Sequence, residues 1–422
     1  MEIMMAVTPT YDEKDAAYAR NGARPRQGRR VVMCCDGTWN DPDAAAPTNV
    51  VRVAMAVARE DSARVPQLVY YHPGVGTKPS ERMRGGVLGY GLSRNVRDCY
   101  RYLVDTYRPG DELYFFGFSR GAYTARSVIG LINNCGILRP EHRDRLDDAY
   151  RLYKSRDPLT HPRARESQLF RRSYSWDDTE LDIRFVGVWD TVGAMGIPID
   201  GLYIPHFMKR KWGFHDATLN DHVRHAYQAV AIDEKRGPFK PALWEKKDEA
   251  PEDQVVEQVW FAGDHCDVGG GHKGGHTESE LSDIPLLWMV ERARACGLAF
   301  SSGHFQFRDR HAAGPRAAAD YDETTVAPNP LGTIHDLRKG FFRLVPQNER
   351  RLGAASKEGQ VAVGESAASS AQLRQEEMPD YDPPTLVEWL NAHKPVTAVD
   401  NSPFYQVTEA GREHPAVTHD RS

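Results

Sequence analysis

A five-residue stretch with glycine at both ends and serine at its centre is the first candidate for chemistry. It runs Gly117-Phe118-Ser119-Arg120-Gly121 and matches the pattern G-x-S-x-G. In this pattern the serine occupies a strained turn between a strand and a helix, where a side chain at either glycine would clash. Such a turn exposes the hydroxyl above a sheet, so the sequence predicts Ser119 as a nucleophile, with Gly117 and Gly121 shaping the turn.

The residues around the motif distinguish a catalytic turn from an incidental serine. The preceding residues, ELYFFGF, are typical of a buried strand, and the following AYTARSVIGLI is typical of an apolar helix. A nucleophile turn requires this succession of strand, turn and helix, which favours the catalytic interpretation. The alternative is a turn of small residues that contains a serine without a catalytic role.

A serine nucleophile also needs hydrogen-bond donors for the oxyanion that forms during acyl transfer. The backbone N–H of Arg120, at the start of the next helix, is one candidate. The second lies in the loop Cys35-Asp36-Gly37-Thr38, with the N–H of Gly37 or Thr38 as the expected donor. We expect Asp36 to orient this loop by bonding its backbone. An ordinary Asp-Gly turn is the alternative.

Two further strand ends supply an acid and a base in the order that a hydrolase triad requires. Asp190 ends the apolar run IRFVGVWD, and His265 follows VVEQVWFAGD. Functional groups gather outside the carboxyl ends of parallel strands. The sequence therefore predicts a triad of Ser119, Asp190 and His265, in which the histidine is the general base and the aspartate orients it. For Asp190 alone, capping of the following turn is a competing interpretation.

The neighbourhood of His265 also allows a metal hypothesis. Asp264 and Asp267 flank this histidine, and His272 and His276 follow closely. A metal ion could be held by His265, Asp267, His272 and His276, although their spacing matches no established ligand pattern. Asp264 and Asp267 also compete with Asp190 as the partner of His265. We expect no metal and no cofactor, with Asp267 supporting the site, and keep a metal-dependent hydrolase as an alternative.

These residues need a scaffold of alternating strands and helices. Most of the predicted strands are continuous apolar runs separated by segments of helical periodicity, the pattern of a parallel sheet covered on both faces. The predicted fold class is therefore α/β, an α/β-hydrolase fold with a mostly parallel central sheet. Two of the expected helices are NVVRVAMAVARE, with Thr48 as its N-cap, and SDIPLLWMVERARAC, with Ser282 as its N-cap.

One catalytic domain with additional segments accounts for the chain of 422 residues. The segment poor in large apolar side chains is predicted to be a flexible linker, and the charged segments between core strands are predicted caps. The expected division is a disordered leader (1–28), a catalytic domain (29–345) with cap insertions (138–180 and 198–250), a linker (346–380), and a tail (381–422) whose short helix is PTLVEWLNAHK.

Composition excludes several classes of protein. The net charge is −5 and no basic block occurs, which argues against nucleic acid as a partner. Six cysteines without a C-x-x-C pair are typical of reduced thiols in the cytosol. No secretory signal or long apolar span is recognisable, so we expect a cytoplasmic protein, exported only by a route that needs no such signal. Contact with a membrane would then occur at its surface. The oligomeric state is not indicated.

Several blocks of the sequence resemble a family of uncharacterised α/β-hydrolase domains that includes the catalytic domains of type VI secretion phospholipase effectors. The resemblance implies Ser119, Asp190 and His265 as the triad, and lipid esters as the substrate. The sequence departs from the family at Asp264-His265-Cys266, where members more often have a small residue before the histidine and a serine after it. The matching blocks are CCDGTWN, YYHPGVGT, GDELYFFGFSRGAYTARSVIGLI, FVGVWDTVGA, AIDEKRGPFKPALW, and EQVWFAGDHCDVGGG followed by LSDIPLLWM.

One of these blocks carries a charged group outside the predicted triad. Asp233, Glu234 and Arg236 could line the site, but a structural ion-pair network is the favoured interpretation. Together the patterns predict a serine ester hydrolase of the phospholipase or lipase type that works through an acyl-enzyme on Ser119. The alternatives are the metal-dependent hydrolase and a hydrolase fold retained as a non-catalytic interaction module.

Overall fold

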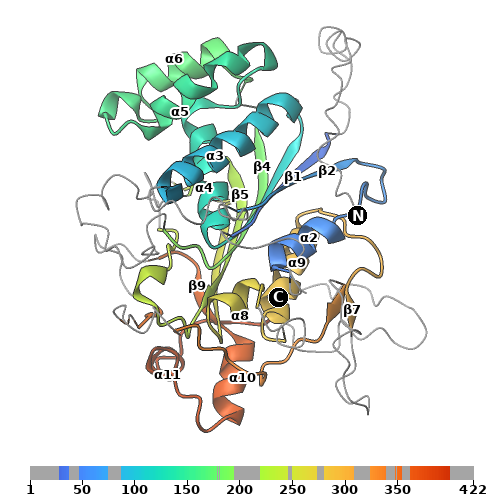
Figure 1. Cartoon of the computed structure of the whole chain (residues 1–422), viewed down its shortest axis with the longest axis vertical. Coiled ribbons are helices and arrows are strands. Elements are labelled where there is room, and N and C mark those ends of the chain that lie inside the picture. Colours follow the sequence, from blue (N-terminus) through green and yellow to red (C-terminus); the bar gives the residue numbers. More distant parts are fainter. Residues whose placement is uncertain are drawn as a thin grey trace.

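A computed structural model defines the architecture between residues 28 and 399 (Figure 1). Predictions for the leader, the end of the tail and the segment 194–218 lie outside the described residues. The residues that the structure describes are 28–37, 47–74, 87–177, 179, 181–193, 219–245, 250–272, 280–307, 324–338, 347, 349–353 and 362–399.

A central sheet of eight parallel strands organises these residues, which confirms the predicted α/β-hydrolase fold class. The strands are β1 (Arg30–Cys35), β2 (Gln67–His72), β3 (Glu112–Phe118), β4 (Asp182–Trp189), β5 (Val223–Ala231), β6 (Val255–Phe261), β9 (Glu365–Ala368) and β10 (Val396–Thr397). Their order across the sheet is β10-β9-β6-β5-β4-β3-β1-β2. A separate pair consists of β7 (Gln306–Phe307) and β8 (Thr325–Val326).

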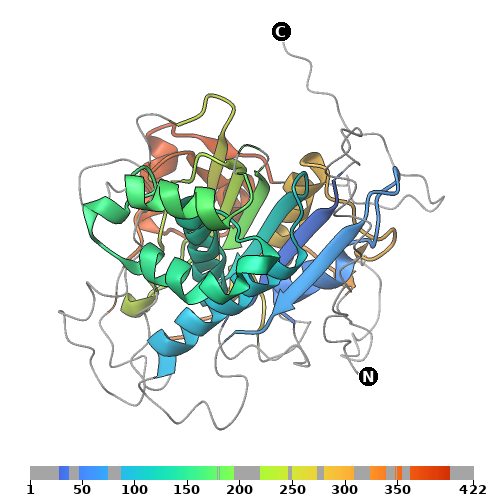
Figure 2. The same cartoon turned by 90° about the horizontal axis from the view of Figure 1, so that it is seen from above.

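Helices cover both faces of the sheet, as Figures 1 and 2 show. The longer helices are α2 (Asn49–Ala56), α3 (Val87–Thr106), α4 (Arg120–Cys135), α5 (Leu146–Lys154), α6 (Arg165–Tyr174), α9 (Asp283–Ala295), α10 (Ser369–Glu377) and α11 (Pro384–Asn391). Shorter turns are η1 (Pro140–Arg145), η2 (Pro158–Thr160), η4 (Gly237–Phe239) and α8 (His265–Gly269).

Two hydrophobic cores lie on opposite faces of the sheet. Along β1, Val32 and Cys34 belong to the core that contains residues of α2 and α9, whereas Val31 and Met33 belong to the core with α3 and α4. Successive side chains of a strand point to opposite faces, so a strand between two layers must be apolar throughout. This is why the core strands are continuous apolar runs in the sequence.

The two predicted helix caps have different outcomes. Thr48 caps α2, since its side chain accepts a hydrogen bond from the N–H of Val51. Ser282 was expected to cap α9, but within the described residues its side chain makes no capping hydrogen bond. Its φ of −72° and ψ of −18° are already helical, and a capping residue needs an extended backbone.

The predicted linker over residues 346–380 is wrong for its described second half. β9 extends the sheet beside β6, and Gln258 on β6 bonds the backbone of Val363 and Gly364. Ala367 is fully buried there, and a Cβ atom at Gly364 would lie 2.0 Å from the carbonyl oxygen of Val256. The low content of large apolar residues therefore marks tight packing rather than a linker.

The prediction of caps over the site is also corrected. The helices of residues 138–180 pack around the far end of α4, where the side chain of Arg171 donates to the carbonyl of Asn134 at 2.9 Å. α4 begins beside Ser119, and these helices contact its later turns, where Tyr153 of α5 lies against Gly130 and Arg171 of α6 donates to Asn134. The second predicted cap, 198–250, contains β5, a core strand.

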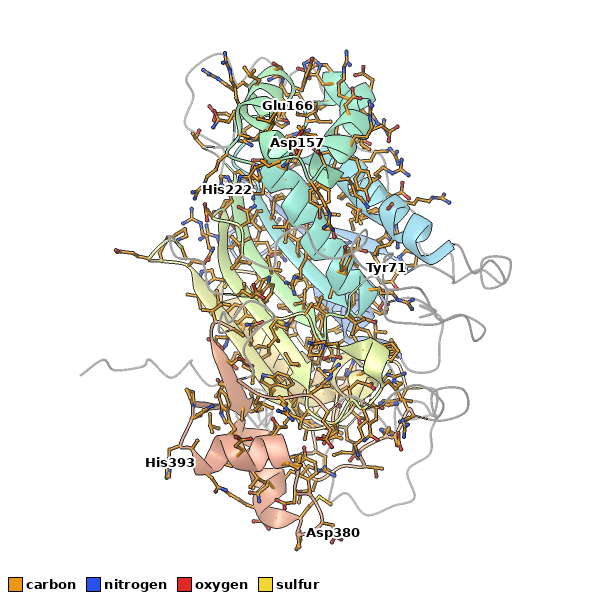
Figure 3. All side chains as sticks on the ribbon, turned by 90° about the vertical axis from the view of Figure 1, so that its left-hand side faces the viewer. Tyr71, Asp157, Glu166, His222, Asp380 and His393 are labelled. Atoms are coloured by element: carbon orange, nitrogen blue, oxygen red, sulfur yellow. The ribbon has the colours of Figure 1, made fainter. Side chains whose placement is uncertain are left out.

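The C-terminal helices form the end of the molecule opposite α6 (Figure 3). Asp380 and His393 label that end, and Glu166 labels the other. α11 coincides with the short helix expected in the tail, and its Leu386 and Trp389 are buried in the same core as α9. Among the described helices, none combines the length and apolar character needed to cross a bilayer.

We predict that Leu386→Ala lowers the free energy of unfolding by roughly 2–5 kcal/mol, because it leaves a cavity in a core shared with the sheet. Urea unfolding followed by tryptophan fluorescence and by far-UV circular dichroism measures the effect. Both signals should shift together.

Leu169→Ala on α6 is the matched control, since this leucine is 53% exposed. It should change the free energy of unfolding by less than about 0.5 kcal/mol. If Leu386→Ala left the main transition in place, the C-terminal helices would not belong to the common core.

Candidate active site

Ser119 lies in a sharp turn between β3 and α4. Its φ of 58° and ψ of −121° are unfavourable for a residue with a side chain. The turn is held because the N–H of Ser119 donates to the carbonyl of Trp189 at 3.0 Å. A Cβ atom at Gly121 would lie 2.1 Å from the carbonyl oxygen of Cys35, and one at Gly117 would lie 2.6 Å from Cα of Ala122. Both glycines are therefore sterically required.

Three side chains from separate strand ends meet at this turn. Nε2 of His265 lies 2.8 Å from Oγ of Ser119, and Nδ1 of the same ring lies 2.5 Å from Oδ2 of Asp190. Asp190 follows β4, and His265 is the first residue of α8 after β6. All three residues are buried, with at most 6% of each exposed. The structure thus brings the three predicted residues into one hydrogen-bonded relay.

The charges in this relay follow from its surroundings. Burial by itself would raise the pKa of Asp190, but Arg350 and then His265 outweigh it and lower that pKa. A carboxylate can only accept, so Nδ1 of His265 donates and Nε2 is left to accept from the Ser119 hydroxyl. Burial lowers the pKa of His265 despite the opposing effect of Asp190. The imidazole is therefore neutral at pH 7 and able to take a proton.

A buried arginine that the sequence analysis did not single out holds the carboxylate of Asp190. Nη1 of Arg350 lies 2.5 Å from Oδ1, and Nη2 lies 2.9 Å from Oδ2. The same guanidinium donates to the backbone carbonyls of Ala231 and Phe239, and its side chain is 1% exposed. The N–H of Ala231 also donates to Oδ1 of Asp190 at 3.0 Å. These contacts leave the carboxylate little freedom to rotate.

Aromatic rings and a second ion pair fix the position of His265. The centroid of the Phe118 ring lies 4.6 Å from the centroid of the imidazole, and the centroid of the Phe239 ring lies 5.0 Å from it. Glu234 and Arg236 form a buried pair at 2.6 Å, and Oε2 of Glu234 accepts from the N–H of His265 at 3.4 Å. The pair is buried, as an ion pair within the structure would be, and it also contacts the backbone of the histidine.

Asp233, the third charged residue of that block, connects the site to the C-terminal segment. Its Oδ2 accepts from the N–H of Gly263 at 2.6 Å and from the hydroxyl of Tyr381 at 3.0 Å. Gly263 lies in the turn that leads from β6 into α8. Tyr381 of the C-terminal segment therefore helps to hold the turn before His265, through Asp233.

The loop expected to complete the oxyanion hole is ordered by Asp36. Oδ2 of Asp36 accepts from the hydroxyls of Thr48 and Tyr71, each at 2.8 Å. The N–H of Gly37 donates to Oδ1 of Asp36 at 2.6 Å, so it is engaged by that carboxylate rather than directed at an oxyanion. Thr38 lies outside the described residues. Arg120 is the first residue of α4, which places its N–H next to Ser119.

The alternative of a four-ligand metal cluster that includes His265 is not supported, because both ring nitrogens of this histidine contact Ser119 and Asp190. Asp264 and Asp267 do not compete for this ring either. Oδ1 of Asp264 accepts from the N–H groups of Cys266 and Asp267, and Oδ2 of Asp267 accepts from the N–H of Asp264. These bonds form a capping box at the start of α8. His276 lies outside the described part of the chain.

Comparison with known families assigns the chain to one of them. Residues 29–292 match the family described as T6SS, Phospholipase effector Tle1-like, catalytic domain. This match covers more than half of the chain. The chain belongs to this family. Ser119, Asp190 and His265 all lie within the matched residues, as the resemblance of the sequence blocks implied.

Individual relatives of this Tle1-like domain are distant. The uncharacterized protein YEL023C of Saccharomyces cerevisiae is 27% identical over 233 residues, which are 50% of this chain and 32% of the yeast protein. The chain thus spans about a third of that relative's length.

Three solved structures show partial similarity. An uncharacterized protein from Pseudomonas aeruginosa is 18% identical, with a TM-score of 0.38, over 69% of this chain and 50% of its own. The Tle1 effector bound to the VgrG spike of the Type 6 secretion system is 17% identical, with a TM-score of 0.29, over 58% and 52%. The metagenomic carboxyl esterase MGS0156 is 12% identical, with a TM-score of 0.29, over 64% and 79%. All three scores are below 0.5, so the family match alone assigns the chain.

Arg350 lies beyond the end of the matched Tle1-like region at residue 292. No motif or spacing in the sequence marks this arginine, because its partner is 160 residues away. Only the folded structure brings it to the end of β4. The matched region contains Ser119, Asp190 and His265, and a later segment supplies the cation that pairs with Asp190.

We predict that Gly121→Ala destabilises this Tle1-like domain by roughly 2–4 kcal/mol or prevents folding, because the new Cβ would lie 2.1 Å from a backbone oxygen that cannot move freely. Urea denaturation of the purified variant measures the loss.

Gly130→Ala on the same helix is the control. Its Cβ would meet only the ring of Tyr153 at 3.0 Å, and alanine favours a helix by up to about 1 kcal/mol over glycine. A Gly121→Ala variant as stable as Gly130→Ala would contradict the required close approach.

Proposed function

We propose that this protein is a serine hydrolase that cleaves carboxylic esters, with lipid esters of the phospholipase type as its substrates. The observation that carries the proposal is the buried relay of Ser119, His265 and Asp190, with contacts of 2.8 Å and 2.5 Å. Membership of the Tle1-like catalytic family supports a hydrolase of lipase or esterase type. The lipid substrate rests on the description of that family.

The geometry supports acyl transfer in two steps. Oγ of Ser119 attacks the ester carbonyl while Nε2 of His265 takes its proton, and a C–O bond forms. The carbonyl electron pair becomes an oxyanion next to the N–H of Arg120. When the tetrahedral intermediate collapses, His265 gives the proton to the departing alkoxide. Water, activated by the same imidazole, then releases the acid and restores Ser119.

Asp190 and Arg350 act on this chemistry through His265. The carboxylate orients the imidazole and stabilises the imidazolium that forms during each proton transfer. The bidentate arginine keeps the carboxylate ionised and fixes both of its oxygens. Arg350 is therefore a positioning residue, since its guanidinium contacts Asp190 and neither Ser119 nor the ring of His265 in the described contacts.

We predict that a fluorophosphonate probe labels the wild-type protein and fails to label Ser119→Ala, because only an activated hydroxyl forms the phosphonate ester. Hydrolysis of a phospholipid in mixed micelles should disappear in the same variant. His265→Ala should lower kcat by roughly 10³-fold or more. Gel fluorescence and fatty-acid release measure the two reactions.

Ser127→Ala is the matched control, a second buried serine two turns along α4. It should be labelled like the wild type. Equal labelling of wild type and Ser119→Ala would remove Ser119 as the nucleophile. Labelling of Ser119 without hydrolysis of phospholipids, but with hydrolysis of short-chain esters, would reject only the lipid substrate.

We predict that Arg350→Met lowers kcat by roughly 10- to 100-fold with little change in KM, because it removes charge-assisted hydrogen bonds that orient the acid. Arg350→Lys should recover part of the loss, since it restores the charge but not the bidentate geometry. Steady-state ester hydrolysis gives both constants.

Arg52→Met controls for the loss of a buried ion pair elsewhere. Arg52 pairs with Asp283 at 2.5 Å, with both side chains 2% exposed. The Arg52→Met variant should have a lower melting temperature than the wild type and an unchanged kcat. If Arg350→Met and Arg52→Met reduced kcat equally, the effect would be one of stability, and Arg350 would have no positioning role.

A further inference from the structure

Three potential metal ligands meet behind the catalytic histidine. Asp267 lies on α8, His272 follows this helix, and His335 comes from a distant segment. Nε2 of His272 lies 2.8 Å from Oδ1 of Asp267, and Nδ1 of His335 lies 2.6 Å from the same oxygen. One ligand atom from each residue falls within a group no wider than 4.8 Å. The two imidazole rings lie 4.0 Å apart.

A fourth polar side chain lies against this group. Asp264 is 2% exposed, and its Oδ1 is 3.9 Å from Nε2 of His272. Its other oxygen, Oδ2, has no hydrogen-bond partner within the described residues. The carboxyl groups of Asp264 and Asp267 repel each other electrostatically, and an unsatisfied buried carboxyl oxygen is costly. A bound cation would offset both costs.

We propose that Asp267, His272 and His335 form a binding site for a divalent transition-metal ion of the Zn²⁺ class. Two imidazole nitrogens and one carboxylate oxygen are a donor set that suits such an ion, whereas Ca²⁺ and Mg²⁺ prefer oxygen alone. Asp264 lies beside the three ligands, with its Oδ1 3.9 Å from Nε2 of His272. This site is separate from the proposed reaction, because the ring of His265 is fully used by Ser119 and Asp190.

The geometry requires only a small adjustment to accept the ion. Zn²⁺ bonds of about 2.0–2.1 Å place tetrahedral ligand atoms roughly 3.3 Å apart, so the contacts of His272 and His335 to Asp267 must open by about 0.5 and about 0.7 Å. His335 lies in a segment without helix or strand, which can make this shift. Each neutral imidazole would present a lone pair to the ion and carry its proton on the other ring nitrogen.

The ion would act as a clamp between distant segments. The N–H of His335 already donates to Oδ2 of Asp267 at 3.0 Å. The segment before His335 is held to α10, because Arg374 donates to the carbonyls of Pro330 and Gly332, each at 2.7 Å. Binding would therefore connect α8, whose first residue is His265, to the C-terminal helices through a coordinate bond.

The test uses the full-length protein loaded with Zn²⁺ and then freed of loosely bound ion by gel filtration. We expect one equivalent of zinc by elemental analysis, and visible absorption bands of tetrahedral coordination when Co²⁺ replaces it. Zn²⁺ should also raise the melting temperature of the wild type, since an ion bound to the native state stabilises it. Absence of bound metal in the wild type, with no Co²⁺ bands, would overturn the proposal without any variant.

His335→Gln and His272→Gln separate a metal site from a hydrogen-bonded cluster, because a glutamine amide can still donate to Asp267. Each should weaken Zn²⁺ binding by at least roughly tenfold. His142→Gln, which removes a histidine that contacts Arg139 outside the cluster, should bind like the wild type. Equal binding by all variants would show that the ion sits elsewhere and overturn the assignment.

Fluorophosphonate labelling of Ser119, measured with and without a chelator, keeps this proposal apart from the proposed function. Labelling that persists in chelator while zinc is lost would place the ion outside the reaction, as proposed. Labelling that disappears together with the zinc would overturn the structural role and favour a metal-dependent reaction. Bound zinc without labelling would reject the serine hydrolase and leave the metal site in place.

Discussion

A fully buried carboxylate at the end of β4 is the interaction on which the rest of the site depends. Asp190 has no exposed surface, so the protein itself must satisfy its charge. It does so with the bidentate guanidinium of Arg350, the ring of His265 and the N–H of Ala231. If the carboxylate became neutral, it would no longer dictate which nitrogen of His265 carries the proton. The tautomer that leaves Nε2 to accept a proton follows from this one charge balance, whereas burial keeps the ring neutral.

This constraint makes the C-terminal segment part of the site. The family match ends at residue 292, yet the cation against Asp190 is residue 350. The same segment adds β9 to the sheet beside β6 and bonds Asp233 through Tyr381. The strand ends that present Asp190 and His265 are therefore held from two sides. A catalytic domain defined by the matched residues alone would leave a buried carboxylate without its countercharge.

Backbone strain at two of the three relay residues has the same physical origin. Ser119 and Asp190 both have positive φ, at 58° and 40°, which costs free energy for residues with side chains. Tight packing compensates this cost: Gly121 lies against the carbonyls of Cys35 and Asp36, and the N–H of Ser119 bonds Trp189. The close glycine contacts hold the strained turn, and the strained turn holds the relay in place. A site that is preorganised in this way needs little rearrangement during a reaction.

The features that depend on neighbouring residues in the chain could be predicted from their types and spacing. The turn at Ser119 follows from two glycines within five residues, and the apolar runs before Asp190 and His265 define strand ends that a parallel sheet must gather at one edge. The partners that come from distant segments are apparent only in the folded structure. Arg350 lies beside Asp190, His335 lies beside Asp267, and β9 occupies part of the predicted linker. The tertiary structure also places the helices of residues 138–180 at the far end of α4 and turns the N–H of Gly37 toward Asp36. These contacts join residues that no local pattern relates, because their energies depend on burial and on distances that arise only when the whole chain has folded.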